Sequence, residues 1–345
     1  MNKNIIITGG TGFIGSHTCI ELLTSANYNI IIIDNLCNSK QNVIDKIEKI
    51  TKNKNITFYN NDLLNKQEID KIFQKYNPYA VIHFAGLKAV GESIKYPCNY
   101  YQNNLISTLN LIEIMDKYQC YNLIFSSSAT VYGKQESPLK EDYIIGQNIT
   151  NPYGQTKFMI EQILKDICIS NNKWNIISLR YFNPIGAHKS GLIGENPNDI
   201  PNNLMPYILK VAVNNNTSKN LGIQFNNLKI FGHDYDTPDK TCQRDFIHVV
   251  DLAKGHISAL DKINELNGYH VFNLGTGNPT SVLEIINIFK KVNNVKLPYD
   301  FSPRREGDLD ICFCDPDYTY KILNWKALLS VEDMCIDSWK FQLNN

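Results

Sequence analysis

The stretch Thr8-Gly9-Gly10-Thr11-Gly12-Phe13-Ile14-Gly15 decides the fold class of this 345-residue chain. It directly follows the apolar run Ile5–Ile7 and opens a segment with helical spacing, Ser16–Ser25. The three glycines at 9, 12 and 15 permit a tight turn, a close approach of the backbone to a pyrophosphate, and close packing of the helix. We therefore expect a strand, a phosphate-binding turn and a helix whose N-terminus faces the anion.

Further β-branched runs alternate with helical segments through the first half of the chain, which is typical of βαβ units and a parallel sheet. The expected strands are Ile5–Thr8, Ile30–Asp34, Ile56–Tyr59, Ala80–Phe84, Leu123–Ser126 and Ile176–Arg180. The expected helices include Ser16–Ser25, Gln67–Tyr76, Leu105–Tyr118 and Gly154–Cys168. This order predicts a Rossmann-type α/β fold, a doubly wound parallel sheet that binds ligands at the carboxyl ends of its strands.

The second half of the chain has a looser pattern, with Pro, Gly and Asn between shorter elements. A strand is expected at Val271–Leu274 and a helix at Ser281–Lys291. We predict a dinucleotide-binding Rossmann domain over residues 1–182, to which segments of 245–295 return, and a smaller, interwoven substrate-binding domain over 183–345. The Asn-rich stretch Asn214–Asn227 is interpreted as a surface loop insertion without a functional role.

The composition excludes several classes of function. Lys+Arg and Asp+Glu both number 34, so no excess of positive charge favours binding to nucleic acid. No apolar run approaches the roughly 20 residues that span a bilayer, and no signal-peptide cleavage pattern is present. An odd number of cysteines, nine, favours free thiols in a reducing compartment. We expect a cytoplasmic protein with no membrane partner and no metal site, because no His or Cys spacing matches a zinc set.

An acidic residue stands at the end of the second expected strand. Asp34 follows the glycine-rich turn by roughly 20 residues, where a carboxylate can accept hydrogen bonds from the adenosine ribose of a dinucleotide. The same carboxylate would repel a 2′-phosphate, so the pattern favours NAD over NADP. A merely solvated Asp at a strand end is the alternative interpretation.

A serine, a tyrosine and a lysine form the second pattern. Ser126–Ser128 end an expected strand, and Tyr153 and Lys157 lie four residues apart, on one face of a helix. A free tyrosine has a pKa of ~10, and positive charge from Lys157 and a nicotinamide would bring it near ~7. We predict Tyr153 as general base, with Ser128 holding the same substrate hydroxyl. Taken alone, a Tyr–Lys pair at this spacing usually means a solvated helix face.

Together these motifs resemble the short-chain dehydrogenase/reductase superfamily, in its extended form acting on nucleotide sugars. From about Ile5 to Gln342 the chain resembles the UDP-galactose 4-epimerase (UDP-glucose 4-epimerase) family. The blocks that carry the resemblance are 83–93, 126–133, 180–184, 201–206, 244–256 and 304–308. The resemblance implies an isomerase that interconverts UDP-galactose and UDP-glucose by transient oxidation at carbon 4, with tightly bound NAD. It also implies a homodimer through the helices containing Leu105–Tyr118 and Tyr153–Cys168.

The same resemblance, together with the motifs, gives two sets of binding residues. Those around NAD are Gly9, Gly12, Phe13, Ile14, Gly15, Asp34, Asn35, Leu36, Cys37, Asn38, Ser39, Asp62, Leu63, Phe84, Ala85, Gly86, Leu87, Lys88, Asn103, Tyr153, Lys157 and Phe182. Those around the UDP-hexose are Lys88, Ser128, Tyr153, Asn183, Asn203, Leu204, Lys229, Phe231, Arg244, Arg305, Asp308 and Cys312. Two arginines suit a diphosphate because each offers a planar fork of donors. Phe246 departs from the family pattern, which has a tyrosine beside Arg244.

Two alternatives to a 4-epimerase share parts of this pattern. A nucleotide-sugar 4,6-dehydratase needs a further acid and base, an Asp-Glu pair where this chain has Ala129-Thr130. A dinucleotide-sensing regulator on the same fold would be expected to have lost the Tyr/Lys pair, which this chain keeps.

In the resembling epimerases the position of Cys312 faces carbon 2 of the hexose, and a small residue there leaves room for an acetamido group. We therefore expect turnover of UDP-GalNAc and UDP-GlcNAc as well, the alternative being that Cys312 merely packs beside Cys314.

Overall fold

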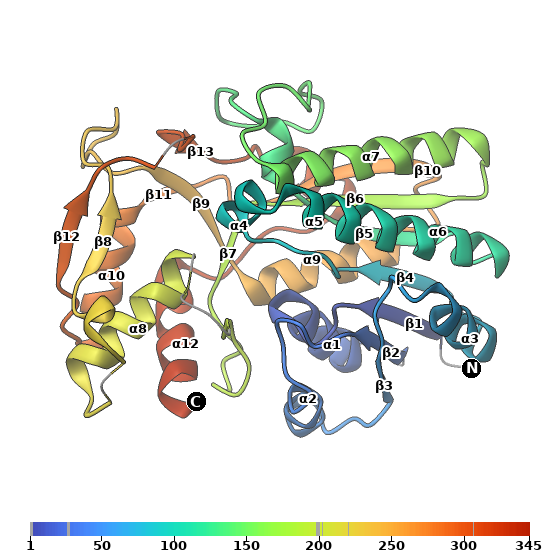
Figure 1. The fold of residues 1–345 in the computed structure, drawn as a ribbon, viewed down its shortest axis with the longest axis horizontal. Helices are drawn as coiled ribbons and strands as arrows, with labels where there is room; N and C mark the ends of the chain where they lie inside the picture. Colours follow the sequence, from blue (N-terminus) through green and yellow to red (C-terminus); the bar gives the residue numbers. More distant parts are fainter. Residues whose placement is uncertain (1–2, 26–27, 198–200, 202, 220, 306) are drawn as a thin grey trace.

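A seven-stranded parallel sheet organises the larger part of the molecule (Figure 1). The computed structural model describes residues 3–25, 28–197, 201, 203–219, 221–305 and 307–345. The strand order is β10-β6-β5-β4-β1-β2-β3. Their bounds are β1 (Lys3–Thr8), β2 (Tyr28–Asp34), β3 (Ile56–Asn60), β4 (Ala80–His83), β5 (Asn122–Ser128), β6 (Asn175–Tyr181) and β10 (Gly268–Leu274). The order reverses between β1 and β4, so the crevice at the carboxyl ends of these two strands is the expected ligand site.

Helices cover both faces of this sheet because both faces are apolar. Successive side chains of a strand point to opposite faces, so Ile5 and Ile7 pack against one helical layer and Ile6 packs against the other. The first layer contains α1 (Phe13–Ser25), α2 (Val43–Thr51) and α9 (Val249–Lys262). The second contains α3 (Lys66–Tyr76), α6 (Ser107–Lys117) and α7 (Pro152–Ser170). Two short helices, α4 (Val90–Lys95) and α5 (Pro97–Tyr101), and the π-helical segment η1 (Gln102–Ile106) lead into α6. We call this sheet with its helices the Rossmann part.

A second body, which we call the C-terminal part, surrounds its own apolar core (Figure 1). Its helices are α8 (Leu204–Asn216), α10 (Val282–Asn293) and α12 (Val331–Asn344). Its strands are β7 (Asn183–Ile185), β8 (Leu228–Phe231), β9 (Gln243–His248), β11 (Pro279–Ser281), β12 (Tyr299–Ser302) and β13 (Ile311–Cys312). The short helix η3 (Ile223–Phe225) also belongs to this part, whereas η2 (Ala129–Tyr132) packs against α7 and α11 (Asp317–Leu323) packs against α9 and β10. Capping boxes start α10 at Ser281 and α12 at Ser330, where each serine accepts a hydrogen bond from the helix and a carboxylate bonds back.

The two parts are interleaved along the sequence. Strand β7 follows β6 directly but pairs with β9, in a small sheet that also contains β11 and β13. Helix α9 and strand β10, late in the chain, pack in the Rossmann part. The carboxyl ends of the parallel strands therefore face the small sheet that contains β9 and β13. Ligands bound between them can contact both parts at once.

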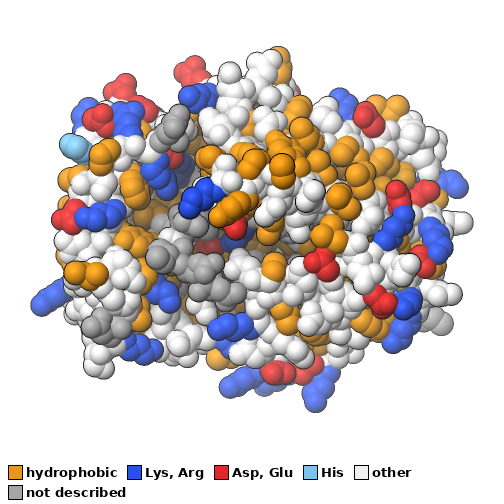
Figure 2. All heavy atoms as spheres, in the orientation of Figure 1, with side chains coloured by type: hydrophobic (Ala, Val, Ile, Leu, Met, Phe, Trp, Pro, Cys, Tyr) orange, Lys and Arg blue, Asp and Glu red, His pale blue; other side chains and the backbone are white. Residues whose placement is uncertain are grey.

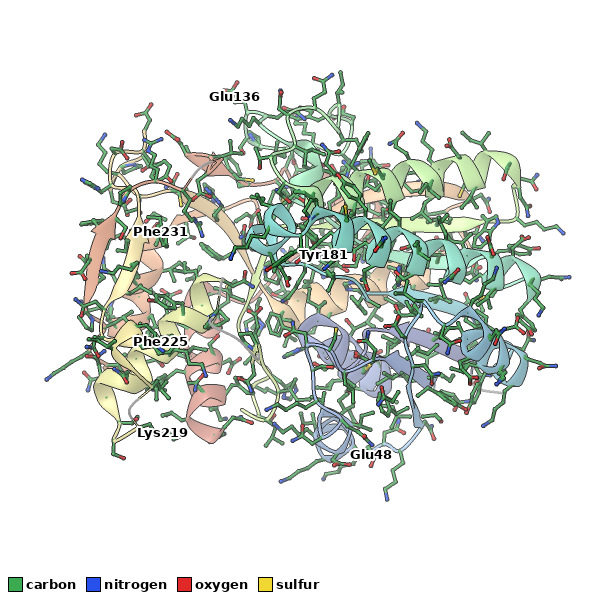
Figure 3. The ribbon with its side chains drawn as sticks, viewed as in Figure 1. Glu48, Glu136, Tyr181, Lys219, Phe225 and Phe231 are labelled. Carbon is green, nitrogen blue, oxygen red and sulfur yellow. The ribbon has the colours of Figure 1, made fainter. Side chains whose placement is uncertain are left out.

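The fold class and the expected elements are confirmed, with most strands one or two residues longer than expected. Two details differ. The helix expected at Leu105–Tyr118 begins earlier, as the π-helical segment η1, which an apolar spacing of 3.6 residues does not reveal. The interpretation of Asn214–Asn227 as a surface loop was wrong at both ends: residues 214–216 complete α8, and Phe225 is buried in the C-terminal core (Figure 3). Among the described residues, no helix is long and apolar enough to cross a membrane.

Candidate active site

The turn between β1 and α1 is built from bare backbone. Gly9 has a φ of +70°, and a Cβ there would lie 2.8 Å from the backbone nitrogen of Ala85. A Cβ on Gly15 would lie 2.3 Å from the carbonyl oxygen of Gly9. The Gly12 amide donates to that same carbonyl at 3.1 Å and closes the turn. Positions 9, 12 and 15 therefore carry no side chain beside the N-terminus of a 13-residue helix, which lets an anion come close to the backbone there.

Asp34 ties this turn to the loop that follows β2. One carboxylate oxygen accepts from the Thr11 amide at 3.1 Å, and the other accepts from the Leu36 amide at 2.9 Å and the Ser39 hydroxyl at 3.2 Å. The carboxylate is nearly buried, yet its two oxygens can accept more than three hydrogen bonds. Asp34 is therefore fixed in place with capacity left for a ribose hydroxyl.

The loops after β2, β3 and β4 line the same edge of the sheet and carry most of the predicted cofactor residues. The Asn35 side chain donates through Nδ2 to the Asp62 carboxylate at 2.8 Å, which joins the first two loops. The Leu87 amide donates to the side chain of Asn104 at 2.8 Å, and Asn104 in turn donates to the Leu87 carbonyl at 3.1 Å. Of the other predicted cofactor residues, Phe13 and Ile14 open α1, Asn103 lies in η1, Phe182 follows β6, and the loops after β2, β3 and β4 carry Cys37, Asn38, Leu63, Phe84, Ala85, Gly86 and Lys88.

Sequence reasoning missed Asn104. Its buried side chain holds the loop after β4 and also donates to Thr156 of α7 at 3.1 Å. It therefore fixes two walls of the site to each other. An asparagine directly before the expected helix Leu105–Tyr118, next to the predicted Asn103, was the available signal, because asparagine is a weak helix former that competes for backbone hydrogen bonds.

Ser128 and Tyr153 meet at the carboxyl end of β5. The Ser128 oxygen accepts from the amide and the hydroxyl of Thr130, at 3.2 and 3.0 Å, so its own proton is free to be donated elsewhere. A hydrogen bond from Ser128 stabilises the phenolate form of Tyr153, but burial has the larger effect and raises the Tyr153 pKa above 10. Tyr153 is therefore protonated in the protein by itself.

Lys157 lies one helical turn after Tyr153, and its ammonium is buried. Nζ donates to the Ser126 carbonyl at 2.6 Å and lies 5.8 Å from the centroid of the Tyr153 ring. Burial lowers the pKa of Lys157 to about 7, against the opposing effect of the Glu161 carboxylate. The lysine alone does not lower the Tyr153 pKa, so the lowering predicted from the sequence depends on the additional positive charge of a bound nicotinamide.

NAD fits these residues. The glycine turn holds backbone close together at positions where a Cβ would clash, as a turn that approaches a pyrophosphate requires, and Asp34 retains acceptor capacity for an adenosine ribose. A 2′-phosphate would meet that carboxylate. The donor set of the site therefore matches NAD and not NADP.

The small sheet brings several predicted substrate residues together. Asn183 of β7 pairs with Phe246 of β9, and Cys312 of β13 pairs with Arg244 of β9. Arg244 donates to the Leu309 carbonyl at 2.8 Å, which aligns its guanidinium along this edge. Cys312 thus neighbours Arg244 in the sheet, although 68 positions separate them in the sequence.

Phe246 lies in the apolar core of the C-terminal part and is almost fully buried. It shares a strand face with Arg244, two residues before it, because side chains alternate along β9. The hydroxyl of the tyrosine expected here is replaced by a purely apolar contact.

The remaining charged residues of the predicted substrate set are paired with each other or with neighbours. Arg305 donates to Asp308 at 2.9 Å, and its guanidinium lies 5.2 Å from the Phe231 ring. Lys229 forms an ion pair with Asp300 at 2.9 Å. Phe231 and Lys229 belong to β8, on the left of Figure 3, whereas Tyr181 marks the end of β6 in its centre. These exposed side chains line the outer edge of the site.

Glu195, which sequence reasoning also missed, joins two predicted substrate residues. Its carboxylate accepts from Lys88 Nζ at 3.0 Å and from Asn203 Nδ2 at 2.9 Å. Asn203 is the N-cap residue of α8, which begins at Leu204. Lys88 and Asn203 come from different parts of the molecule, so Glu195 bridges the two parts.

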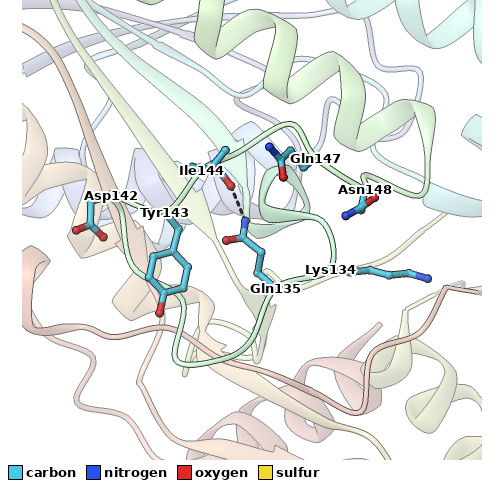
Figure 4. A pocket seen from close by; sticks show the side chains of 7 residues that line it. All are labelled: Lys134, Gln135, Asp142, Tyr143, Ile144, Gln147 and Asn148. Carbon is cyan, nitrogen blue, oxygen red and sulfur yellow. Dashed lines mark hydrogen bonds between the residues drawn. The ribbon is translucent and has the colours of Figure 1, made fainter.

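A separate hollow of about 390 Å³ lies in the segment between η2 and α7 (Figure 4). Its lining includes Lys134, Gln135 and Tyr143, and the Gln135 side chain donates to the Ile144 carbonyl at 2.5 Å. None of its lining residues belongs to either predicted set. We therefore do not assign it to the active site.

The known proteins that this chain resembles agree with the geometry. Residues 5–275 match the model of the NAD dependent epimerase/dehydratase family. The chain belongs to this family. It is 51% identical over 342 residues to the UDP-glucose 4-epimerase of Bacillus subtilis, covering 99% of this chain and 97% of that one. The resemblance inferred from the sequence is confirmed.

Solved structures of the family superpose closely. The UDP-glucose 4-epimerase of Bifidobacterium longum, in complex with NAD+ and UDP, has a TM-score of 0.92 and 46% identity over 99% of both chains. The UDP-Glc/GlcNAc 4-epimerase of Campylobacter jejuni has a TM-score of 0.82 and 32% identity over 100% of both chains. The predicted Rossmann fold is thereby confirmed, and so is NAD as the cofactor of the family.

Proposed function

We propose that this protein is a UDP-glucose 4-epimerase that interconverts UDP-galactose and UDP-glucose with tightly bound NAD. The observation that carries the proposal is the joint presence of the bare glycine turn, the fixed Asp34 and the Ser128–Tyr153–Lys157 group at one sheet edge. When bound, NAD accepts a hydride from carbon 4 of the sugar and returns it to the opposite face. The chain itself must bind the nucleotide firmly, leave the hexose free to rotate, and move one proton.

Tyr153 moves that proton. The phenolate removes the proton of the 4-hydroxyl as the sugar is oxidised to the 4-keto form, and returns it when the sugar is reduced. Ser128, which accepts from Thr130 and donates to the Tyr153 oxygen, is placed to donate to the same sugar oxygen once substrate is bound. Lys157, anchored on the Ser126 carbonyl, adds positive charge beside the phenol.

The C-terminal part holds the UDP. Arg244 and Arg305 provide planar donor forks for the diphosphate, with Asp308 between them at 3.6 and 2.9 Å. Phe231 and Lys229 on β8 are positioned for the uridine, and Asn183, Asn203 and Leu204 border the hexose. This division leaves few strong contacts to the sugar ring, so the 4-keto sugar can rotate and present its opposite face to the cofactor.

A 4,6-dehydratase remains the weaker alternative on chemical grounds. Its elimination of water needs an acid and a base beside carbons 5 and 6, whereas Ala129 and Thr130 hold those positions in η2. Thr130 donates to Ser128 and cannot act as the missing carboxylate.

The test is incubation of purified protein with UDP-galactose without added NAD, with separation of UDP-glucose as product. We expect equilibration of the two sugars and release of NAD(H) from the denatured protein. Stoichiometric consumption of added NAD, or release of NADP instead, would show a dehydrogenase and reject the closed redox cycle.

We also propose activity on UDP-GalNAc and UDP-GlcNAc. Cys312 is small, and its thiol stays protonated because burial raises its pKa to about 11. Beside Arg244 it leaves space for an acetamido group. The Campylobacter jejuni relative, named for both glucose and N-acetylglucosamine sugars, supports a site of this kind.

We propose a homodimer through α6, α7 and the segments that precede them. Apolar side chains gather on this face of the molecule (Figure 2), among them Val90, Ile94, Ile106, Leu109 and Met159, each more than a third exposed. Sedimentation analysis should give twice the mass of the 39.5 kDa chain. Ile94→Glu combined with Leu109→Glu should give monomers.

We also propose a division of the chain into two domains and a cellular location. We place the boundary near residue 182, where β6 ends and β7 joins the small sheet, with 245–295 returning in part to the Rossmann part. We place the protein in the cytoplasm, because the nine cysteines are all free thiols.

A further inference from the structure

Glu195 occupies an unusual position between the two parts of the molecule. A single carboxylate oxygen accepts from Lys88 Nζ at 3.0 Å and from Asn203 Nδ2 at 2.9 Å. The Glu195 side chain is 11% exposed, whereas that of Lys88 is 49% exposed. The carboxylate thus lies inside the site, and the ammonium reaches inward to it from the loop after β4.

Stability gives no sufficient reason for this arrangement. An ion pair with one half-exposed partner contributes little to folding. Asn203 is the N-cap residue of α8, and asparagine is among the best N-cap residues, yet its side chain does not cap the helix. The Asn203 side chain donates to Glu195 instead. The helix therefore lacks a side-chain cap at this end, and the asparagine makes a contact inside the site.

The contact changes the charge that a hexose meets. Lys88 and Asn203 both belong to the predicted substrate set, and without Glu195 they would present an uncompensated ammonium. A free ammonium attracts any sugar that carries its own carboxylate, whereas a paired ammonium and carboxylate are neutral together. An additional anion would also be repelled by Glu195 itself.

We propose that Glu195 is a specificity-determining residue that excludes hexuronates by cancelling the charge of Lys88. UDP-glucose and UDP-galactose, whose hexoses are uncharged, are admitted, and a UDP-hexuronate with a carboxylate at carbon 6 is rejected. This inference rests on the proposed function, because it assumes that the nucleotide of a UDP-sugar binds beside β8 and β9.

The test is the substitution Glu195→Gln. The glutamine oxygen can still accept from Lys88 and Asn203, so geometry is kept while the negative charge is lost. Titration calorimetry with UDP, UDP-glucose and UDP-glucuronate should show roughly tenfold tighter binding of UDP-glucuronate and little change for the other two. The gain should shrink at higher ionic strength, because part of it is a screened attraction.

Two further variants make the result specific. Glu113→Gln makes the same charge change in an exposed ion pair between α3 and α6, and should leave UDP-glucuronate binding unchanged. Adding Lys88→Met to Glu195→Gln should remove the gain, because the attraction acts through that ammonium. Unchanged binding of UDP-glucuronate by Glu195→Gln, or an equal gain in Glu113→Gln, overturns the proposal. Failure of the unmodified protein to bind UDP would instead reject the proposed function, and this inference with it.

Discussion

The two sides of the active site are prepared for their ligands in different ways. On the Rossmann side the binding groups are backbone or side chains already fixed by the protein, such as the glycine turn and Asp34 with its three hydrogen bonds. On the C-terminal side the charged groups are paired with each other, as in Arg305–Asp308 and Lys229–Asp300. A ligand adds bonds on the first side, but on the second it must exchange partners.

This difference suits the two ligands. A preformed cradle binds without reorganisation and favours a group that stays bound. Paired, exposed side chains can release one partner for another, which favours a ligand that enters and leaves at each turnover. The hydrogen bonds of Asp34 and the ion pairs of Arg305 and Lys229 thus match a cofactor that is retained and a substrate that is exchanged.

The largest expected effect is at Tyr153, where the two sides meet. Tyr153→Phe should retain bound NAD and UDP affinity but lower kcat by ~10²–10⁴-fold, the usual contribution of a general base. Initial rates with UDP-galactose and the dinucleotide content of the purified variant provide the measurement. Near-normal turnover would transfer the role of base to Ser128 or Thr130.

The glycine turn formed by Gly9, Gly12 and Gly15 can be distorted by a substitution at Gly15. An added methyl group would lie 2.3 Å from the Gly9 carbonyl, so Gly15→Ala must displace backbone and should lower NAD affinity by on the order of 100-fold. The measurement is the NAD(H) that co-purifies. The control is Gly91→Ala, where an added methyl group meets nothing within 4 Å. Full cofactor content in Gly15→Ala would contradict a preformed, rigid cradle.

Cys312→Tyr should change selectivity. The larger side chain overfills the space beside Arg244, so activity on UDP-GlcNAc should be lost while activity on UDP-glucose remains. The size of the loss is at least ~100-fold, because a clash cannot be relieved in a paired strand. Cys312→Ser should keep both activities. If the unmodified enzyme does not turn over UDP-GlcNAc, the assignment of Cys312 fails.

Arg305→Ala tests the exchangeable side. We expect a KM for UDP-glucose about tenfold higher, with kcat, NAD content and thermal stability nearly unchanged, because the Arg305 side chain is 53% exposed. Arg304→Ala is the matched control, since Arg304 pairs with Asp234 and Asp310 outside the predicted set. A loss of bound NAD in Arg305→Ala would show that the two sides are not independent.

The smallest effect concerns stability and pH. The Lys157 pKa is lowered by burial to about 7, while in the unfolded chain it is near 10.5. Between these values the unfolded state binds more protons, so the Lys157 contribution to stability rises as the pH rises from about 7 to 10. Lys157→Met should therefore raise the melting temperature of the NAD-free protein at pH 6–7 and raise it less at pH 10, while activity is lost. An equal change at every pH would contradict a buried ammonium.

The fold of the Rossmann part could be predicted from the sequence because its signals are local. Glycines 9, 12 and 15 act within one turn, and Tyr153 and Lys157 act within one helical turn, so spacing alone brings them together. The strands are apolar on both faces and read as continuous runs, which explains why their expected positions were nearly correct.

The C-terminal side could not be predicted in the same detail because its contacts are non-local. Cys312 meets Arg244 through a strand pairing that no local spacing reveals, and Glu195 becomes part of the site only through Lys88, 107 positions away. The sequence predicts a loop at the end of α8 because three consecutive asparagines disfavour a helix. In the structure their side chains donate to carbonyls of the helix and of a neighbouring segment.

The return of β10 to the edge of the seven-stranded sheet limits where the chain can be truncated or divided. A truncated protein ending after β6 would lack β10 and α9 and would expose the edge of β6 together with the apolar face of α1. Such a fragment would aggregate instead of acting as a free-standing dinucleotide module. The Rossmann part is therefore complete only in a chain that continues through β10, and a single cut cannot separate it from the C-terminal part.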